Sequence, residues 1–405
     1  KKFIYLSMIS LFKQIDLFKI YQYLLVTLAF LMPITVAGAN VIIVIICFLW
    51  LFSGNYRYKY EQIRSSKLLL ASIGFFLLHV VGLIWTEDLM WGLHIVHKMW
   101  YFFLLLPILF TLVIKKNIKY YIYSFLIAIA ITEILSYSVW LELIPPFKNA
   151  TIANPTPFMS HISYNPILAF AIYLVLHEIF FNNKLTKIEV IFYSFFSISM
   201  SINMFITGGR AGQVMFFAVL SLLIFQYFNS QKFKAIVVIF IVSSTIFLTA
   251  YQTSNIFIAR VNNAISDIQD YESHKNTSLG QRISFALNSW EVIKNNPIIG
   301  VGTGDFPLEY KKINIKNTPE LPNGTNPHNM YILIQMQLGI LGLISFFLIF
   351  YYQVKLSLSK KNIFIKDVGF ALPILFLIIM FSDSYLLGHY TSLMFIFFSS
   401  FLYKD

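Results

Sequence analysis

Long apolar runs separated by short polar segments dominate this chain. A membrane-spanning helix needs ~20 apolar residues, and ~17 to 25 are tolerated. Twelve runs approach or meet this length, although the second run and the last two are short. They cover residues 20–37, 39–54, 68–85, 99–114, 119–143, 162–181, 188–206, 211–228, 235–251, 329–353, 368–383 and 388–403. The pattern predicts an all-α polytopic membrane protein of about 12 transmembrane helices, forming one integral membrane domain over residues 1–405.

The composition agrees with this fold class. Hydrophobic residues make up 58% of the 405 residues and charged residues only 12%, which is more apolar surface than a soluble core of this length hides. The net charge of +12 is compatible with nucleic-acid binding, but basic residues beside apolar runs more often orient a chain in a membrane. We therefore expect contacts with membrane lipids and no nucleic-acid partner.

Lysine and arginine predict the orientation of the chain. Placing both termini and alternate loops in the cytoplasm collects 20 of the 30 basic residues there, and seven of the other ten lie in one long loop, which has little influence on orientation. Both termini are predicted to be cytoplasmic. The first residues lack a small-residue cleavage site, so we expect a retained anchor rather than a signal peptide. Cys47 is the single cysteine, which excludes a disulfide within one chain.

The segment 252–327 is the predicted large outer loop, and it differs most from the apolar background. It contains seven basic and seven acidic residues, so it is neutral and should fold. Residues 277–297 predict an amphipathic helix that begins at a cap, Thr277 or Ser278, and ends before Pro297. Its apolar stripe is expected to pack on the membrane face of the bundle; the stripe consists of Ile283, Ala286, Leu287, Trp290 and Ile293.

Two arginines are candidates for binding an anion. Arg210 lies in a short outer turn after Gly208 and Gly209, and its guanidinium group offers five donors that suit phosphate oxygens. Arg282 lies in the first turns of the predicted loop helix. The alternatives are an interfacial arginine that contacts lipid headgroups for Arg210, and a solvated surface charge for Arg282.

Histidine at the outer boundary is the candidate catalytic group. His328 follows Pro327 and precedes the tenth apolar run, and a neutral imidazole can accept a proton from a hydroxyl group near neutral pH. A capping or interfacial histidine is the alternative. Asn329 is a candidate to orient the ring or a ligand. His161 begins the sixth run as His328 begins the tenth, so we expect it to face the same outer cavity.

Other polar residues carry weaker signals. His94 and His97 lie three residues apart, but two nitrogens without a dependable third ligand are poor evidence for zinc. We expect no metal and no other cofactor. Glu133, Glu178 and Asp383 lie within or at the ends of apolar runs, where they form either a proton path or pairs inside the bundle.

Two segments together resemble the bacterial O-antigen ligase and polymerase superfamily. They are NNPIIGVGTGDF, ending at Phe306, and NPHNMYILIQMQLGILG, ending at Gly342. The ligase branch of that superfamily carries a histidine, then Asn, Ser or Gln, then nine residues, a glycine and a small or polar residue three positions on. His328, Asn329, Gly339 and Gly342 match this pattern. Arg210 and Arg282 resemble the two arginines of the family.

The resemblance implies a membrane glycosyltransferase. Its substrates would be a glycan on undecaprenyl diphosphate and, in the favoured ligase branch, a sugar hydroxyl of lipid A–core. The reaction would need no metal and would invert the anomeric carbon at the periplasmic face of the bacterial inner membrane. Arg210 and Arg282 would bind the diphosphate, and His328 would accept or position the proton of the acceptor hydroxyl, with Asn329 and His161 in support.

Three alternatives stay open at this stage. A polymerase of O-antigen or exopolysaccharide uses the same donor with another acceptor, and a protein O-oligosaccharyltransferase transfers the glycan to protein. A lipid-glycan flippase or a solute transporter belongs to another class of function, and it predicts repeated halves and interrupted helices around a midplane site. The distinctive polar residues lie at one face of this chain instead, which favours the enzyme.

Overall fold

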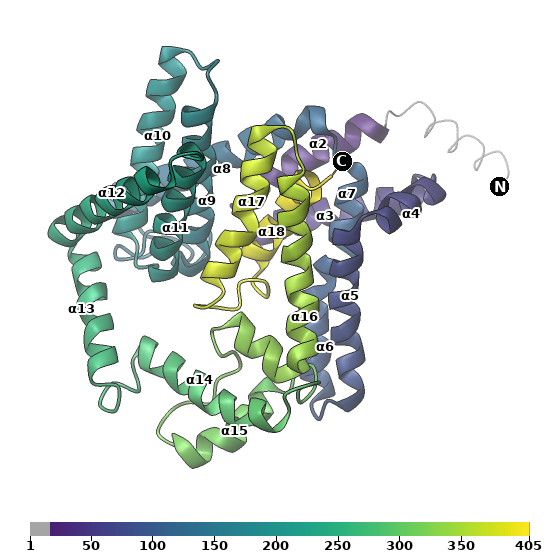
Figure 1. Cartoon of the computed structure of the whole chain (residues 1–405), viewed down its shortest axis with the longest axis vertical. Coiled ribbons are helices and arrows are strands. Elements are labelled where there is room, and N and C mark those ends of the chain that lie inside the picture. The colour runs from purple at the N-terminus through teal and green to yellow at the C-terminus, as the bar shows by residue number, and fades with distance from the viewer. Residues whose placement is uncertain (1–16, 405) are drawn as a thin grey trace.

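The chain folds as a helical membrane protein (Figure 1), and the computed structural model describes residues 17–404. Each of the twelve predicted apolar runs contains a helix, so the all-α polytopic fold is confirmed. The first half contains α2 (Leu17–Leu31), α3 (Val36–Phe52), α4 (Tyr56–Ser65), α5 (Lys67–Val81), η1 (Gly82–Trp85), α6 (Leu89–Trp100), η2 (Tyr101–Leu105), α7 (Leu106–Leu112), η3 (Lys115–Asn117), α8 (Ile118–Trp140) and α9 (His161–Phe181).

The second half contains both further spans and the helices of the predicted outer loop. Its elements are α10 (Lys187–Ile206), α11 (Arg210–Tyr227), α12 (Lys232–Thr253), α13 (Asn255–Gln269), α14 (Ser278–Asn295), α15 (Phe306–Asn317), α16 (Met330–Leu358), α17 (Ile363–Ile379) and α18 (His389–Leu402). The expected loop 252–327 therefore folds, as predicted, and it contains α13 and α15 in addition to the one helix, α14, that the sequence predicts.

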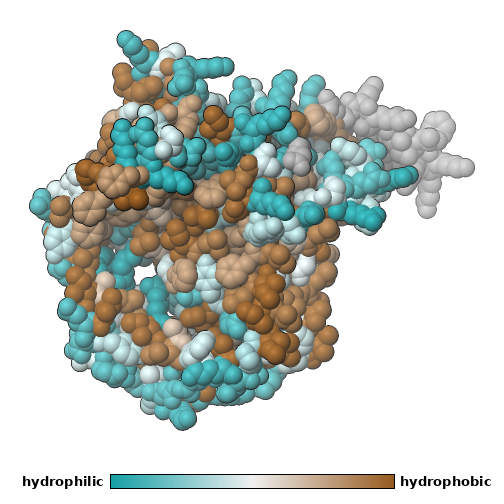
Figure 2. Space-filling view, in the orientation of Figure 1, coloured by the Kyte–Doolittle hydropathy of each residue, from teal (hydrophilic) through white to brown (hydrophobic). Residues whose placement is uncertain are grey.

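Eight helical segments in the described part of the chain are long and apolar enough to cross a membrane. The other four of the twelve predicted runs form shorter helices, α2, α3, α17 and α18, of 14 to 17 residues. Figure 2 shows an apolar band between two polar ends, as expected for a protein surrounded by lipid at its middle.

The helices α13, α14 and α15 lie at one polar end of the bundle, and the chain ends near the other (Figure 1). This places the candidate outer loop opposite the C-terminal end, as the distribution of lysine and arginine predicts. The retained-anchor prediction and the lysines Lys1, Lys2 and Lys13 lie outside the described residues.

The amphipathic loop helix forms where the sequence predicts it, but only part of its predicted apolar stripe is covered: Ile293 is buried and Ile283 and Ala286 are half-buried, whereas the other two residues are exposed. α14 begins at Ser278, capped by Thr277, whose Oγ1 accepts the backbone N–H of Gly280 at 3.1 Å. Leu287 and Trp290 are 57% and 56% exposed. The buried side instead carries Asn288, whose Nδ2 donates to Thr318 Oγ1 at 2.8 Å. A hydrogen-bond network with the end of α15, rather than apolar character alone, decides which face of α14 is covered.

The two motif segments of the sequence pack against each other through a break in α16. Gly339 has φ of 62° and ψ of −157° inside this helix, a conformation that favours glycine. A Cβ at Gly339 would come within 2.2 Å of the carbonyl oxygen of Ile298. Four backbone hydrogen bonds of 2.9 to 3.3 Å join the segments: Ile340 N to Pro297 O, Leu341 N to Ile298 O, Val301 N to Met336 O and Gly302 N to Gln337 O. At the break, backbone groups of α16 therefore bond to the loop segment instead of to their own helix, and they keep hydrogen-bond partners.

Candidate functional site

Three arginines line one cavity between the bundle and the outer helices. The cavity has a volume of about 550 Å³ and is bordered by the beginnings of α9 and α11, the end of α17, and the helices α13 and α14. Arg210, Arg282 and His161 all line it. The sequence predicts that His161 shares a cavity with His328, but His328 is not part of this lining. Arg260 of α13, which the sequence analysis did not single out, is the third arginine. We call this space the arginine cavity; the surface is visibly hollowed between α13 and the bundle (Figure 2).

Close packing of α11 on α9 fixes the position of Arg210. Asn165 of α9 is fully buried, accepts a hydrogen bond from Thr207 Oγ1 at 2.8 Å and donates to the carbonyl oxygen of Gly209 at 3.3 Å. A Cβ on Gly209 or Gly212 would come within 2.5 or 2.1 Å of Asn165. The glycines therefore let the start of α11 approach α9, and Arg210 follows directly as the first helical residue.

The positive charge of the arginine cavity is not neutralised by its own lining. No aspartate or glutamate lines the cavity, and no ion pair between these arginines and a carboxylate is found in residues 17–404. The charges of Arg260 and Arg282 both act on Arg210, and the carboxylate of Asp267 opposes them. The Nε of Arg282 is buried without a hydrogen-bond partner in this part of the chain. A buried donor of one guanidinium group beside two others is suited to an anionic ligand.

The remaining walls of the arginine cavity are largely apolar. Besides the arginines and a few polar residues, the lining consists of residues such as Val214, Ile283, Ala286, Ile378 and Phe381. Ile283 and Ala286 belong to the stripe that the sequence analysis expected to pack on the bundle. The combination of guanidinium groups and apolar walls suits a ligand with an anionic head and an apolar tail.

His328 precedes α16 in a backbone conformation that is unusual for a residue with a side chain, with φ of 51°. Its backbone N–H donates to Asn326 Oδ1 at 3.0 Å, and its ring Nδ1 lies 3.1 Å from Asp383 Oδ1. An ionised carboxylate only accepts hydrogen bonds, so Nδ1 carries the proton and Nε2 is the acceptor nitrogen of the ring. The side chain is 41% exposed, which leaves Nε2 accessible to a substrate.

Asp383, in the loop between α17 and α18, orients the imidazole. Burial by itself would raise the pKa of this carboxyl, but the hydrogen bond and charge of His328, the backbone N–H of Ser384 and the charge of Arg282 together lower it. The group therefore stays ionised at neutral pH. The sequence analysis left a proton path and pairing inside the bundle open for this residue, and the structure pairs it with the candidate base.

Asn329 caps the start of α16. Its Oδ1 accepts the backbone N–H groups of Tyr331 and Ile332 at 2.9 and 3.1 Å, and its Nδ2 donates to the carbonyl oxygen of Phe381 at 3.3 Å. These bonds cap the helix and tie it to the end of α17. Asp383, rather than Asn329, contacts the ring of His328.

Helix α14 connects His328 with the arginine cavity. Arg282 and Phe285 lie three residues apart, on neighbouring parts of one helix face. Arg282 lines the cavity, and the ring of Phe285 lies 6.1 Å from that of His328 between centroids. The charge of Arg282 also acts on Asp383. The structure thus brings His328 beside the arginine cavity without making it part of the lining.

The other polar residues singled out from the sequence either have hydrogen-bond partners nearby or lie outside any group of possible metal ligands. Glu133 Oε1 accepts a hydrogen bond from Ser199 Oγ at 2.5 Å, and Glu178 Oε2 accepts one from Asn182 Nδ2 at 2.8 Å. These contacts agree with pairing inside the bundle. His94 and His97 have no third ligand beside them, in that residues 17–404 contain no group of three or more His, Cys, Asp or Glu placed to hold a metal ion.

Comparison with known proteins identifies the region that carries the arginines and His328. Residues 195–347 match the model of the family described as O-antigen ligase, so the resemblance is confirmed over this region. An uncharacterized protein of Haemophilus influenzae is 30% identical over 230 residues, which are 53% of this chain and 56% of that protein. The chain thus spans about half the length of that relative.

Proposed function

We propose that this protein transfers a polysaccharide from undecaprenyl diphosphate to a sugar hydroxyl of lipid A–core. The reaction takes place at the periplasmic face of the bacterial inner membrane, with both chain termini in the cytoplasm. The observation that carries the proposal is the arginine cavity, where three unneutralised guanidinium groups stand beside apolar walls. A polyprenyl diphosphate has an anionic head and an apolar tail and fits both parts.

The cavity has one more arginine than the intact diphosphate has negative charges, and the reaction explains this excess. A diphosphate esterified at both ends carries one negative charge on each phosphate, and cleavage of the sugar–phosphate bond adds another. Arg210, Arg260 and Arg282 therefore stabilise the leaving diphosphate more strongly than the intact donor. Such preferential stabilisation of developing charge lowers the barrier of the reaction.

His328 acts on the acceptor. The acceptor oxygen forms a bond to the anomeric carbon while the bond between that carbon and the phosphate oxygen breaks. The bonding electrons leave with the diphosphate, and the hydroxyl proton passes to Nε2 of His328. Asp383 keeps Nδ1 protonated and stabilises the imidazolium ion, as a buried carboxylate does for a catalytic histidine in other enzymes. Direct displacement predicts inversion at the anomeric carbon.

Glycan transfer in detergent tests this proposal. Purified protein is incubated with undecaprenyl-diphosphate-linked glycan and lipid A–core in the presence of EDTA, and glycosylated lipid A is measured. We expect transfer by the wild type and a loss of roughly 10²- to 10⁴-fold in His328→Ala, the range of a general base. His274→Ala is the matched control, because Nδ1 of the exposed His274 bonds to the carbonyl oxygen of Asp270, four residues before it.

Two outcomes would contradict the proposal. Unchanged transfer in His328→Ala removes this residue from the mechanism. Longer lipid-linked glycan with no glycosylated lipid A rejects the ligase in favour of the polymerase, which uses the same donor.

A further inference from the structure

A second cavity lies beside the arginine cavity. It has a volume of about 280 Å³, and its walls come from α6, the beginning of α9, the loop before α16 and the loop between α17 and α18. Ile162 and Tyr385 line both cavities. We call the second one the tryptophan cavity, after Trp91 of α6 in its wall. Its size is near the lower end of the ~300–1,000 Å³ of ligand pockets, which suits the terminal sugars of a larger molecule.

Asp383 and Asn326 connect the tryptophan cavity to the candidate base. Both residues line this cavity. Asp383 bonds to the ring of His328, while Asn326 accepts the backbone N–H of His328 and the hydroxyl of Ser384. The tryptophan cavity therefore lies next to the imidazole on one side and next to the arginine cavity on another.

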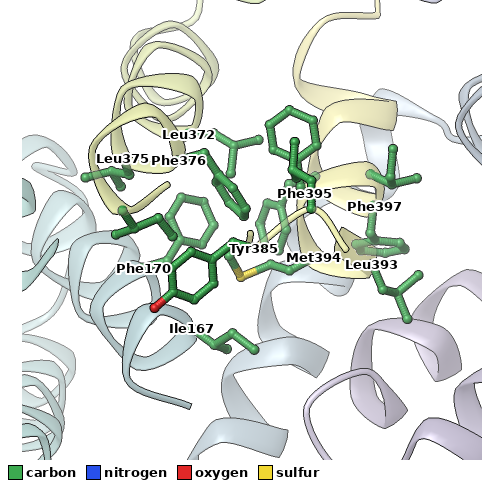
Figure 3. Packing of buried hydrophobic residues seen from close by; sticks show 14 of the residues in the cluster. Ile167, Phe170, Leu372, Leu375, Phe376, Tyr385, Leu393, Met394, Phe395 and Phe397 are labelled. Carbon is green, nitrogen blue, oxygen red and sulfur yellow. The ribbon is translucent and has the colours of Figure 1, made fainter. Parts of the chain in front are cut away.

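One buried donor in the wall of the tryptophan cavity, Trp91 Nε1, has no hydrogen-bond partner in the described part of the chain. A second buried donor, the hydroxyl of Tyr385, has only the side chain of Ser382 beside it. Tyr385 is 3% exposed, and its ring lies between α9 and Met394 of α18, with its hydroxyl at the edge of the packed cluster (Figure 3). Burial, and after it the charge of Asp383, raises the pKa of the phenol, so it remains a donor. Buried donors without partners are rare in folded proteins, which indicates that a ligand supplies the acceptors.

The lining of the tryptophan cavity matches the chemistry of a sugar. The indole of Trp91 offers an aromatic face to the apolar side of a pyranose ring. Ser163 and Thr325 provide hydroxyl groups, whereas Asn326 and Thr391 also line the cavity but bond within the protein. Lys98, about two helical turns beyond Trp91 on α6, is the cation of this lining and is exposed. An ammonium group there complements a phosphate or a carboxylate on the bound sugar.

We propose that the tryptophan cavity binds the acceptor, and that this acceptor is a sugar carrying an anionic substituent, phosphate or carboxylate, that Lys98 contacts. The inference rests on the proposed function and adds the place and the chemical class of the acceptor. Binding there brings the attacking hydroxyl between His328 and the donor, whose diphosphate lies in the arginine cavity.

Acceptor kinetics at saturating donor test the assignment. Lys98→Gln is compared with Lys311→Gln, an exposed lysine of α15, on three acceptors: lipid A–core with phosphorylated core sugars, the same material after dephosphorylation, and carboxyl-reduced material. We expect Lys98→Gln to raise KM for the charged acceptor about tenfold, the effect of one charge-assisted hydrogen bond, and to leave KM for the donor unchanged. The defect should disappear on whichever neutralised acceptor has lost the contacted group, which distinguishes phosphate from carboxylate.

Trp91 supplies the second measurement. Trp91→Ala should raise KM for the acceptor, and Trp91→Phe, which keeps an aromatic face, should recover most of the loss; thermal unfolding shows whether either variant is destabilised. The assignment is overturned if Lys98→Gln affects all three acceptors equally, if it raises KM for the donor, or if neither position changes KM for the acceptor in an active enzyme. A wild type that transfers glycan to none of the three acceptors refutes the proposed function instead.

Discussion

The arginine cavity and the tryptophan cavity share Ile162 and Tyr385 but differ in charge. The first is lined by three guanidinium groups and no carboxylate, whereas the second combines Lys98 and Asp383 with hydroxyl groups and an indole. A cavity of one sign suits a ligand that gains negative charge as it reacts, and a mixed polar cavity suits a neutral hydroxyl beside a single charge. In the proposed function, the separate cavities therefore place donor and acceptor in surroundings of different charge.

The two cavities also differ in their relation to the family. Most of the arginine cavity, including its three arginines, lies within the matched residues 195–347. Of the tryptophan cavity only Thr325 and Asn326 lie within that region. The part of the chain shared with the family therefore contains the charged cavity, while the walls that contact the proposed acceptor come mainly from outside it.

Removing the charge of the arginine cavity should have the largest effect. We expect the double variant Arg210→Ala/Arg282→Ala to lose on the order of 10³-fold in kcat/KM, because removal of one preorganised donor to a developing charge costs ~10²–10³-fold. Arg260→Ala alone should lose about tenfold, since two cations remain. Steady-state transfer assays measure both, with Arg64→Ala, an exposed arginine of α4, as the control. Equal loss in the control, or full activity in the double variant, would contradict the role of this charge.

Changing Asp383, the carboxylate in the wall of the tryptophan cavity, should have the next largest effect. Asp383→Asn keeps the shape but replaces the carboxylate, which only accepts, by an amide that can also donate to Nδ1 and no longer fixes the tautomer of His328. We therefore expect kcat to fall about 10²-fold or more while KM for the donor stays unchanged. Asp270→Asn, at an exposed position after α13, is the matched control. A loss confined to KM for the donor would place Asp383 with the arginines instead.

The same variant has a predicted pH signature. Because the pKa of Asp383 is lowered in the folded protein, its contribution to stability is present above the ordinary carboxyl pKa of ~3.9 and is lost as the pH falls through the folded value. Thermal unfolding of the wild type and Asp383→Asn should therefore differ at neutral pH and converge only at a pH below about 4. Convergence already at neutral pH would show that the carboxylate contributes nothing to the fold.

A change at Tyr385, which lines both cavities, should have the smallest effect on transfer. Tyr385→Phe removes one hydroxyl from a buried ring without changing its packing, so we expect a loss of about five- to tenfold in kcat/KM, the value of one neutral hydrogen bond. Tyr60→Phe on exposed α4 is the control. If Tyr385→Phe raises thermal stability and leaves transfer unchanged, the hydroxyl has no ligand partner and the two cavities are independent.

Local sequence signals predict much of the fold and part of the site. Apolar runs locate the helices because the bilayer demands ~20 apolar residues per span, and Thr277 marks the beginning of α14 because a hydroxyl caps free N–H groups. Arg210, Arg282 and His328 are found because motifs surround them. Arg260 is missed because no motif surrounds it and an arginine in a polar helix is most often a surface charge. Like Arg282, however, it lies in the predicted outer loop and is a candidate for binding an anion.

The predicted stripe on α14 shows why the pattern of apolar residues does not by itself predict which face of a helix is buried. Leu287 and Trp290 are apolar yet exposed, and Asn288 is polar yet 3% exposed. The hydrogen bonds of Asn288 reach Thr318, thirty residues away, and no periodicity within α14 reveals such a partner. Burial of a polar side chain is favourable only when a distant partner satisfies it.

The sequence by itself determined that this chain is a helical membrane protein, which end of the bundle carries its distinctive polar residues, and which arginines and histidine belong to a motif. These properties follow from hydrophobicity, charge and capping, which act over one helix or one turn. Only the tertiary structure decided that Arg260 joins Arg210 and Arg282, that Asp383 holds His328 across 55 residues, and that Tyr385 separates two cavities. Those contacts depend on how helices distant in sequence pack, because a side chain acts on whatever the fold places within a few ångströms of it.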